Sequence, residues 1–309
     1  MHLRRKVVIS IVSILFMVSL FAGYQDAFAK DVSKVVETQW LADNLKDVKV
    51  VFVDNWPSAK ESYEKKHIMG GVYMGIGALM GTISANPPDK AQFEGMMNRL
   101  GINNNDHVVL YGPDGESVFT LGAFWLMEYF GHKNVSYLNG GLAKWNKENR
   151  PSEGGMKQAQ PGNYKVGATD ESIRIVADDV LKNLNNPKVA LVDARGTGEF
   201  KGEVNNDKNK RVGYIPGALD LDSKLNFNAD GTLKSAADLK AVYESKGVTK
   251  DKEIIAYCQG GIKASNSYFV LRHVLGYKNV KVYVGSWGEW SGLDFKKYPI
   301  VGKIVEEKK

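Results

Sequence analysis

The feature that most constrains this chain of 309 residues is an internal repeat. The same order of short hydrophobic segments, helical patterns and glycine-containing turns occurs twice along the sequence. Corresponding positions are Asp54 and Asp193, Tyr111 and Tyr257, and Trp145 and Trp290, which are separated by 139, 146 and 145 residues. Small insertions in loops account for the differences among these separations. Matches that keep their order at a nearly constant separation predict a tandem duplication of one structural unit.

Each copy of the repeat alternates short apolar runs with amphipathic segments. Strands that alternate with helices favour a mostly parallel central sheet with helices on both faces. We therefore expect an α/β fold with two tandem domains over residues 30–150 and 169–309, in agreement with the length and a hydrophobic content of 43%. Residues 151–168 are rich in Pro, Gly, Gln and Lys and are predicted to be a linker.

Hydrophobic periodicity places the main elements of both domains. The expected helices cover residues 38–45, 91–100 and 121–130 in the first domain and 177–184, 239–246 and 264–275 in the second. The expected strands cover residues 48–53, 108–111 and 135–138 in the first domain and 189–192 and 254–257 in the second. We expect Thr38 to cap the first helix and a loop to carry Glu61 and Tyr63.

The amino terminus has the pattern of a secretory signal peptide. Basic residues precede an apolar run over residues 7–22, and Ala27-Phe28-Ala29 follows with the small-x-small form of a cleavage site. We expect residues 1–29 to be removed by cleavage near Ala29, which would leave an exported protein, periplasmic or secreted, without a stable membrane anchor. An uncleaved anchor is the alternative, and the apolar run is short for spanning a bilayer.

Charge and motif content argue against several classes of function. The formal net charge is +6, but no dense block of Lys and Arg with interleaved aromatic residues occurs, so we expect no nucleic-acid partner. The five histidines are dispersed, which predicts no metal site. No dinucleotide fingerprint or phosphate-binding loop stands out, and we expect no cofactor.

Cys258 is the only cysteine of the chain, and it falls between a predicted strand and a predicted helix. Ligands of parallel sheets bind at the carboxyl ends of the strands, which is where Cys258 is expected. Paired glycines at Gly260 and Gly261 allow backbone amides to converge there, and a helix start with Lys263 nearby suits a thiolate. Cys258 is therefore a candidate nucleophile. The alternative is a small buried hydrophobic residue without chemistry.

The equivalent loop of the first domain lacks these features. Because Tyr111 corresponds to Tyr257, Gly112 stands at the position of Cys258. Asp114 and Glu116 make that loop acidic. We therefore expect the first domain to be inactive and to cover one side of the active cleft.

Several motifs of the second domain resemble the rhodanese family of sulfurtransferases. They are Val192-Asp193-Ala194-Arg195, Tyr214-Ile215-Pro216-Gly217-Ala218, a Cys-x-x-Gly-x-x-Ala loop at Cys258 to Ala264, and Gly285-Ser286-Trp287-Gly288-Glu289-Trp290. The tandem architecture is similar to thiosulfate and 3-mercaptopyruvate sulfurtransferases. The resemblance implies that Cys258 takes a sulfane sulfur from a small sulfur-containing anion, a polysulfide or a persulfide. The cysteine persulfide would then pass it to a thiol or to cyanide.

The resemblance also implies roles for neighbouring residues. The substrate-binding loop would comprise Gln259, Gly260, Gly261, Ile262, Lys263 and Ala264. Asp193 and Arg195 would brace the loop, and Arg211 could reach an anionic donor. The chain departs from the family where thiosulfate-preferring members carry basic residues after the cysteine, since Gln259 and Gly260 stand there. Glu199 stands where tandem members often place a substrate-holding arginine.

Two other functions compete with sulfur transfer. An exported module that carries sulfur on Cys258 or binds a partner without turnover would use the same fold. A phosphatase of related fold would need an arginine six residues after the cysteine to hold phosphate with two hydrogen bonds. Ala264 occupies that position and Lys263 is the only cation of the loop, which argues against phosphatase activity.

Overall fold

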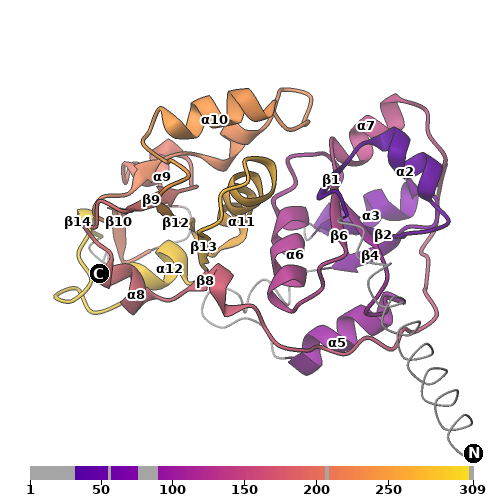
Figure 1. The fold of residues 1–309 in the computed structure, drawn as a ribbon, viewed down its shortest axis with the longest axis horizontal. Coiled ribbons are helices and arrows are strands. Elements are labelled where there is room, and N and C mark those ends of the chain that lie inside the picture. Colours follow the sequence, from indigo (N-terminus) through magenta and orange to yellow (C-terminus); the bar gives the residue numbers. More distant parts are fainter. Residues whose placement is uncertain (1–31, 55–56, 76–89, 206–208, 306–309) are drawn as a thin grey trace, which may run out of the picture. The chain divides into compact units, whose positions relative to one another are not determined.

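Two parallel sheets of five strands organise the chain (Figure 1). The computed structural model describes residues 32–54, 57–75, 90–205 and 209–305. The first sheet has the order β1-β6-β5-β2-β4, with β1 at Val35–Val36, β6 at Val135–Leu138, β5 at Val108–Tyr111, β2 at Lys49–Asp54 and β4 at Val72–Gly75. The second has the order β8-β13-β12-β9-β11, with β8 at Arg174–Ile175, β13 at Val280–Tyr283, β12 at Glu253–Tyr257, β9 at Val189–Asp193 and β11 at Leu219–Asp220. Equivalent strands occupy equivalent places, so the expected tandem α/β fold is confirmed.

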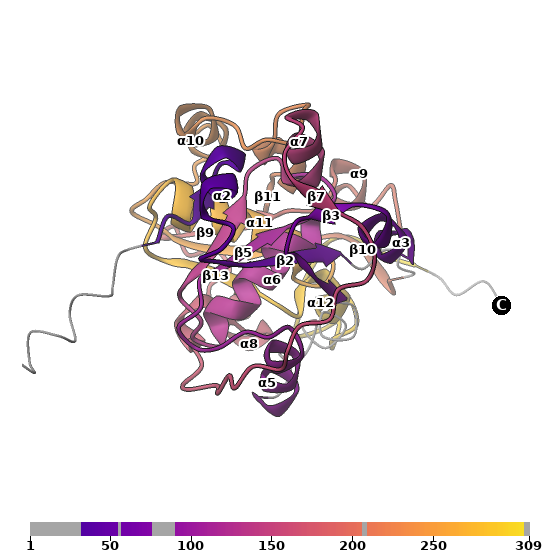
Figure 2. The same cartoon turned by 90° about the vertical axis from the view of Figure 1, so that its right-hand side faces the viewer.

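Helices cover both faces of the first sheet. They are α2 (Thr38–Asn44), α3 (Pro57–Lys65), α5 (Lys90–Arg99), α6 (Val118–Tyr129) and α7 (Gly141–Lys147). α5 and α6 lie on one face of the sheet, and α2, α3 and α7 lie on the other (Figure 2). Their buried side chains form separate clusters with the strand residues of each face. The alternation of side chains along each strand supplies apolar residues to both sides, which is why this sheet needs helices on both.

Two expectations for the first domain are wrong. Glu37, not Thr38, is the N-cap of α2, because Thr38 is the first residue of the helix and its hydroxyl donates to Glu148. The expected loop around Tyr63 is the helix α3. Tyr63 is fully buried, and its hydroxyl donates to the carbonyl of Gly71 at 2.7 Å, so tertiary contacts hold a helix whose sequence is otherwise polar.

The helices of the second domain follow the same plan. They are η1 (Glu171–Ile173), α8 (Ala177–Lys182), α9 (Thr197–Phe200), η2 (Ser223–Asn226), α10 (Ala236–Glu244), α11 (Ile262–Phe269), η3 (Val270–Val274) and α12 (Ser286–Trp290). The helix expected over residues 264–275 therefore begins two residues earlier and changes at Val270 from an α-helix into a turn of π-helix. Buried residues of α10 and α11 lie on one face of the sheet, and those of α8 and α12 lie on the other.

An antiparallel strand pair accompanies each sheet. The first domain pairs β3 (His67–Ile68) with β7 (Ser152–Glu153), and the second pairs β10 (Arg211–Tyr214) with β14 (Val301–Ile304). Gly213 has φ +120°, and a Cβ there would lie 2.0 Å from the carbonyl oxygen of Val301. The close approach of β10 and β14 therefore requires glycine at this position.

One cluster of buried side chains extends through both domains, and α6 and α11 lie at its centre. The rings of Phe124 and Phe269 meet edge to face with centroids 4.7 Å apart. Glu128 on α6 accepts a hydrogen bond from the hydroxyl of Tyr268 at 3.0 Å and lies 2.8 Å from the ring of His273. The nearly complete burial of α6 explains its uniform apolar sequence.

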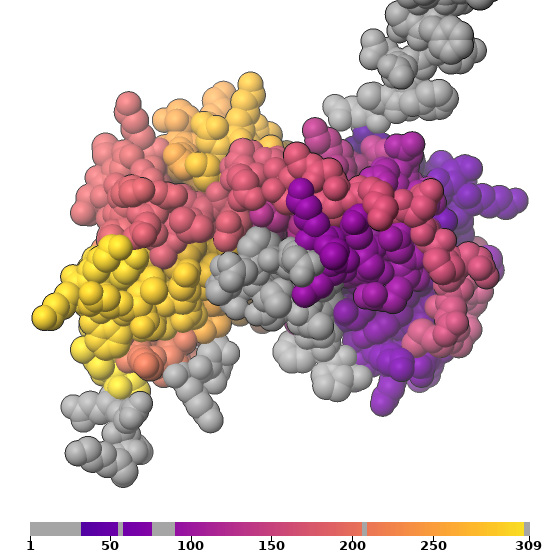
Figure 3. Space-filling model, turned by 90° about the horizontal axis from the view of Figure 1, so that it is seen from below, coloured from indigo at the N-terminus to yellow at the C-terminus, as the bar shows by residue number. Residues whose placement is uncertain are grey.

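The predicted linker follows the surface of the molecule (Figure 3). Tyr164 anchors it, because its ring is buried against Phe93 and its backbone amide donates to the side chain of Asn98 at 2.6 Å. The predicted signal peptide lies outside the described residues. Within the residues that the structure describes, no helix is long and apolar enough to span a membrane.

Candidate functional site

Cys258 occupies the carboxyl end of the central strand of the second sheet. β12 ends at Tyr257 and α11 begins at Ile262, so only four residues connect them. Gly261 makes the turn possible, because its φ of +84° lies in the left-handed region that disfavours other residues. The thiol is free, and Cys258 is 1% exposed. The helix start and the turn thus place one buried thiol where parallel sheets bind ligands.

Ser286 fixes the shape of this loop. Its hydroxyl oxygen accepts hydrogen bonds from the backbone N–H of Cys258 at 3.1 Å and of Gly261 at 3.0 Å, and it donates to the carbonyl of Tyr283 at 2.7 Å. Ser286 is fully buried and has φ +54°, a strained conformation for a residue with a side chain. Ser286 lies in one of the repeated motifs, but its spacing along the chain does not indicate this role.

The start of α12 holds the other side of the loop. The backbone N–H of Trp287 donates to the carbonyl of Cys258 at 2.9 Å, and that of Gly288 donates to the carbonyl of Gln259 at 2.8 Å. Within the described residues, the backbone N–H groups of Gln259, Gly260, Ile262 and Lys263 donate to no protein acceptor. The carbonyls of Cys258 and Gln259 therefore face α12, whereas several N–H groups of the loop and of the first turn of α11 are of the kind that can bind an anion.

The side chain of Gln259 is held by Asn209. The Gln259 Nε2 donates to Asn209 Oδ1 at 2.9 Å, and the Asn209 Nδ2 donates back to Gln259 Oε1 at 3.2 Å. Asn209 in turn exchanges two hydrogen bonds with Asn205, at 2.8 and 3.0 Å. The side-chain amide of Gln259 is thus engaged with the segment that precedes β10, and its backbone N–H has no acceptor among the described residues.

Asp193 and Arg195 form a buried ion pair directly beside the loop. The Arg195 Nε and Nη2 donate to the carboxylate at 2.9 and 2.6 Å, and Nη2 also donates to the carbonyl of Gly213 at 2.7 Å. The guanidinium lies 4.6 Å from the ring centroid of Trp287. Burial acts to lower the pKa of Arg195, but the hydrogen bonds and charge of Asp193 outweigh it, so the pKa lies above its ordinary value. This pair connects β9, β10 and α12, and its contacts are those of a brace.

Arg211 does not reach toward a donor. It is 2% exposed, and its guanidinium donates to the carbonyls of Ser291 at 3.0 Å and Tyr298 at 2.6 Å, and to that of Trp290. A positive charge is favourable there because the carbonyls of Trp290 and Ser291 lie at the carboxyl end of α12. The expectation that Arg211 contacts an anionic donor is therefore wrong, and its contacts give it a structural role.

The remaining residues of the loop divide by exposure. Ala264 is fully buried, and Ile262 packs against the core. Lys263 is 38% exposed, and its ammonium lies 3.7 Å from the carboxylate of Glu199. The ammonium of Lys263 is thus partly accessible to solvent, and it has an acidic partner.

A model of the rhodanese-like domain matches two segments of the chain, residues 37–148 and 176–293. The chain belongs to the rhodanese-like domain family. Sulfur carrier protein TtuD of Thermus thermophilus is 39% identical over 271 residues, which cover 84% of this chain and 94% of that protein. A Mycolicibacterium smegmatis protein provisionally named thiosulfate sulfurtransferase is 35% identical over 266 residues, covering 84% and 95%.

A solved rhodanese-like structure has the same arrangement of two domains. The crystal structure of SseA from Escherichia coli, a 3-mercaptopyruvate sulfotransferase, superimposes with a TM-score of 0.73 at 28% identity. The match covers 83% of this chain and 99% of that one. Fold and sequence therefore agree on the family.

The first rhodanese-like domain keeps the backbone of the loop without its chemistry. Leu142 N–H donates to the carbonyl of Gly112 at 2.9 Å, which corresponds to the bond from Trp287 to Cys258. Gly141, with φ +55°, takes the place of Ser286. The thiol and the hydroxyl that shape the second loop are thus both missing from the first.

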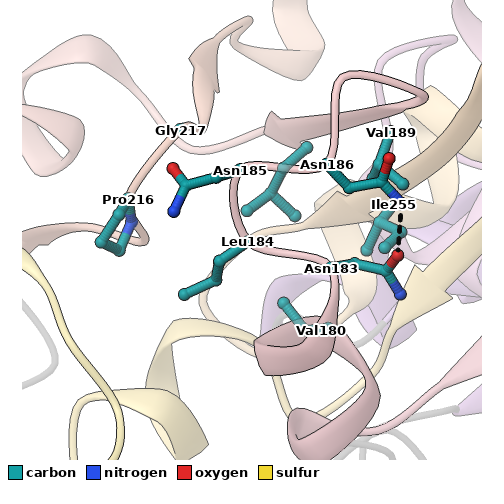
Figure 4. A pocket seen from close by; sticks show the side chains of 10 residues that line it. Val180, Asn183, Leu184, Asn185, Asn186, Val189, Pro216, Gly217 and Ile255 are labelled. Carbon is teal, nitrogen blue, oxygen red and sulfur yellow. Dashed lines mark hydrogen bonds between the residues drawn. The ribbon is translucent and has the colours of Figure 1, made fainter.

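The second rhodanese-like domain contains a small cavity between the end of α8, β9 and the turn after β10 (Figure 4). It has a volume of about 80 Å³ and is lined by residues that include Asn183, Asn185, Val189 and Pro216. Val189 begins β9, so the cavity lies toward the amino end of the sheet, opposite the end that carries Cys258. Within the described residues, no group of three or more His, Cys, Asp or Glu side chains is placed to hold a metal ion.

Proposed function

We propose that this chain is a sulfurtransferase that carries a sulfane sulfur on Cys258. The observation that carries the proposal is the loop itself, in which one thiol lies among backbone N–H groups that have no acceptor among the described residues. Such groups stabilise an anionic sulfur without needing a metal or an organic cofactor. The names of the relatives, a sulfur carrier and a thiosulfate sulfurtransferase, support the same chemistry.

The reaction has two steps. The thiolate of Cys258 attacks the outer sulfur of a donor such as thiosulfate, mercaptopyruvate or a polysulfide, and the bond between that sulfur and the rest of the donor breaks. The leaving group takes the bonding electrons, and a persulfide remains on Cys258. A thiol or cyanide then attacks the outer sulfur of the persulfide and restores the thiolate.

Turnover with cyanide tests this proposal. The protein is incubated with each donor and cyanide, and thiocyanate is measured for the wild type and for Cys258→Ser. We expect thiocyanate formation with at least one donor and its loss in Cys258→Ser. Equal formation by both proteins would contradict the role of Cys258.

A sulfur carrier without efficient turnover is the second candidate, and the 39% identity to sulfur carrier protein TtuD favours it. A carrier loads Cys258 once and releases the sulfur only to a particular acceptor. Pre-steady-state kinetics separate the two functions, because a carrier shows a stoichiometric burst of leaving group followed by little turnover, whatever small acceptor is added.

The amino-terminal sequence supports a further proposal, that the chain is exported. The basic residues, the apolar run and Ala27-Phe28-Ala29 are the features of a cleaved signal. Amino-terminal sequencing of the protein recovered from a Gram-negative host would show a chain that begins near Lys30. A chain that retains residues 1–29 would contradict cleavage.

A further inference from the structure

The cation that follows Cys258 in the loop, Lys263, is paired with a carboxylate. Lys263, in the first turn of α11, lies 3.7 Å from the carboxylate of Glu199 on α9. Glu199 is the more buried partner, with 18% of its side chain exposed against 38% for Lys263. The positive charge that follows the cysteine is therefore matched by a carboxylate that solvent screens less.

A second carboxylate lies next to Glu199. A Cβ built on Gly196 would be 3.6 Å from Asp222 Oδ2 and 3.7 Å from Glu199 Oε2, so both carboxylates converge on this glycine. The segment is adjacent to the loop, because Ala194 N–H donates to the carbonyl of Tyr257 at 2.8 Å. The connection between β11 and η2 is held there too, through the bond from Ser223 N–H to the carbonyl of Ala194 at 3.2 Å.

Three other charged side chains near the loop have partners inside the protein. Asp193 and Arg195 neutralise each other, and Arg211 is bound to the carbonyls of Ser291 and Tyr298. At this rim of the loop, the carboxylates of Glu199 and Asp222 therefore converge on Gly196, and the ammonium of Lys263 lies within ion-pair distance of Glu199.

We propose that Glu199 determines which sulfur donors Cys258 accepts, by disfavouring dianions such as thiosulfate and admitting donors with little or no net negative charge. This inference rests on the proposed sulfurtransferase function and specifies its substrate class. The backbone N–H groups stabilise the single negative charge of the reacting sulfur, whereas a second negative charge on the donor meets the carboxylates of the rim.

A series of thiosulfonate-type donors separates charge from reactivity. Thiosulfate is a dianion, methanethiosulfonate is a monoanion, and 2-aminoethanethiosulfonate is a zwitterion without net charge. In each case the Cys258 thiolate attacks the terminal sulfur and the sulfur–sulfur bond breaks. The leaving sulfite or sulfinate takes the electron pair, so the total charge is unchanged. The second-order rate constant for loading Cys258 is measured for each donor.

Glu199→Gln is the principal variant. Glutamine keeps an oxygen that accepts the N–H of Gly196, which Glu199 accepts at 3.4 Å, so the change removes charge with little loss of structure. We expect the rate constant for loading Cys258 to rise about tenfold for thiosulfate and about threefold for methanethiosulfonate, and to change less than about twofold for the zwitterion. These ratios are expected because a Coulomb effect is proportional to the charge of the donor.

Two further variants distinguish net charge from a specific contact. Lys263→Gln should lower loading by thiosulfate about tenfold, because it makes the rim more negative. The double variant Glu199→Gln with Lys263→Gln has the net charge of the wild type, so its preference among donors should return to within about twofold of the wild-type preference. A double variant that keeps the preference of either single variant would overturn the inference.

Glu244→Gln is the matched control. Glu244 ends α10 and lies 3.9 Å from Lys240, a similar ion pair, but the chain continues from there to the amino end of β12, away from Cys258. Glu244→Gln should change the rate constant for loading Cys258 by less than about 1.5-fold for each of the three donors. Equal effects of Glu199→Gln on all three donors would overturn the inference while leaving the proposed function in place. Loading by none of the donors in the wild type would contradict the proposed function and the inference together.

Discussion

The hydroxyl oxygen of Ser286 lies 3.1 Å from the backbone nitrogen of Cys258 and accepts its hydrogen bond. The same oxygen accepts the N–H of Gly261, so one side chain holds both ends of the four-residue loop. The equivalent position of the first domain is Gly141, which has nearly the same φ and no hydroxyl. The strained serine thus accompanies the cysteine, and both are replaced by glycine in the domain without the thiol.

Removal of the Ser286 hydroxyl should impair the loop. In Ser286→Ala two buried N–H groups lose their acceptor, which should lower the free energy of unfolding by about 1–3 kcal/mol. We expect the rate of persulfide formation to fall about tenfold, measured by stopped-flow release of the leaving group.

Ser286→Gly separates the loss of the hydroxyl from backbone strain. Glycine relieves a conformation that costs a side-chain residue roughly 1–2 kcal/mol, so this variant should be more stable than Ser286→Ala and equally slow. Ser245→Ala, an exposed serine that follows α10, is the control and should change neither quantity. Full activity in Ser286→Gly would show that the hydroxyl is unnecessary.

The ion pair of Asp193 and Arg195 should behave as a unit. Arg195→Met leaves a buried carboxylate without its partner, and Asp193→Leu leaves a buried guanidinium, so each should lower the free energy of unfolding by about 3–5 kcal/mol. The double variant should lose much less than the sum, because no buried charge is left unpaired. Urea denaturation of the three variants measures this, and additive losses would show that the two side chains act independently.

A thiol in the first domain should not create a second site. A Cβ at Gly112 would lie 2.5 Å from the Cβ of Ser117 and 2.7 Å from Oγ1 of Thr120. Gly112→Cys should therefore lower the free energy of unfolding by about 1–3 kcal/mol through overpacking. In the double variant Gly112→Cys with Cys258→Ser, mass spectrometry should find no added sulfur. The first domain has Gly141 in place of Ser286, so it lacks the hydroxyl that shapes the loop, and its loop has little space for a thiol. A persulfide at position 112 would contradict this.

The sequence predicted the strands better than the polar or very short elements. The buried runs over 108–111 and 135–138 match β5 and β6 because short, mostly apolar runs between turns have few alternatives. The helix α3 was missed because only Ala59 and Tyr63 of its described side chains are buried, and a predominantly polar helix depends on tertiary packing. Strands of two residues, such as β8, have no periodicity from which to be predicted.

The sequence predicted which residue carries the thiol of the candidate site, but not the side-chain contacts around it. Cys258 could be placed because it is unique and follows a strand. The roles of Ser286, Arg211 and Glu199 arise from contacts between the ends of different strands, and spacing along the chain contains no information about such contacts. Arg211 shows this most clearly, since the same residue beside the site binds carbonyls of α12 and its flanking turn instead of a donor.

The central claim is that Cys258 carries the transferred sulfur. Intact-protein and peptide mass spectrometry after incubation with thiosulfate, methanethiosulfonate and a polysulfide tests it most directly. The account predicts a gain of one sulfur atom on the peptide that contains Cys258, its removal by cyanide with formation of thiocyanate, and no gain in Cys258→Ser. A wild-type protein that gains no sulfur from any of these donors, or that gains it equally in Cys258→Ser, would contradict the account.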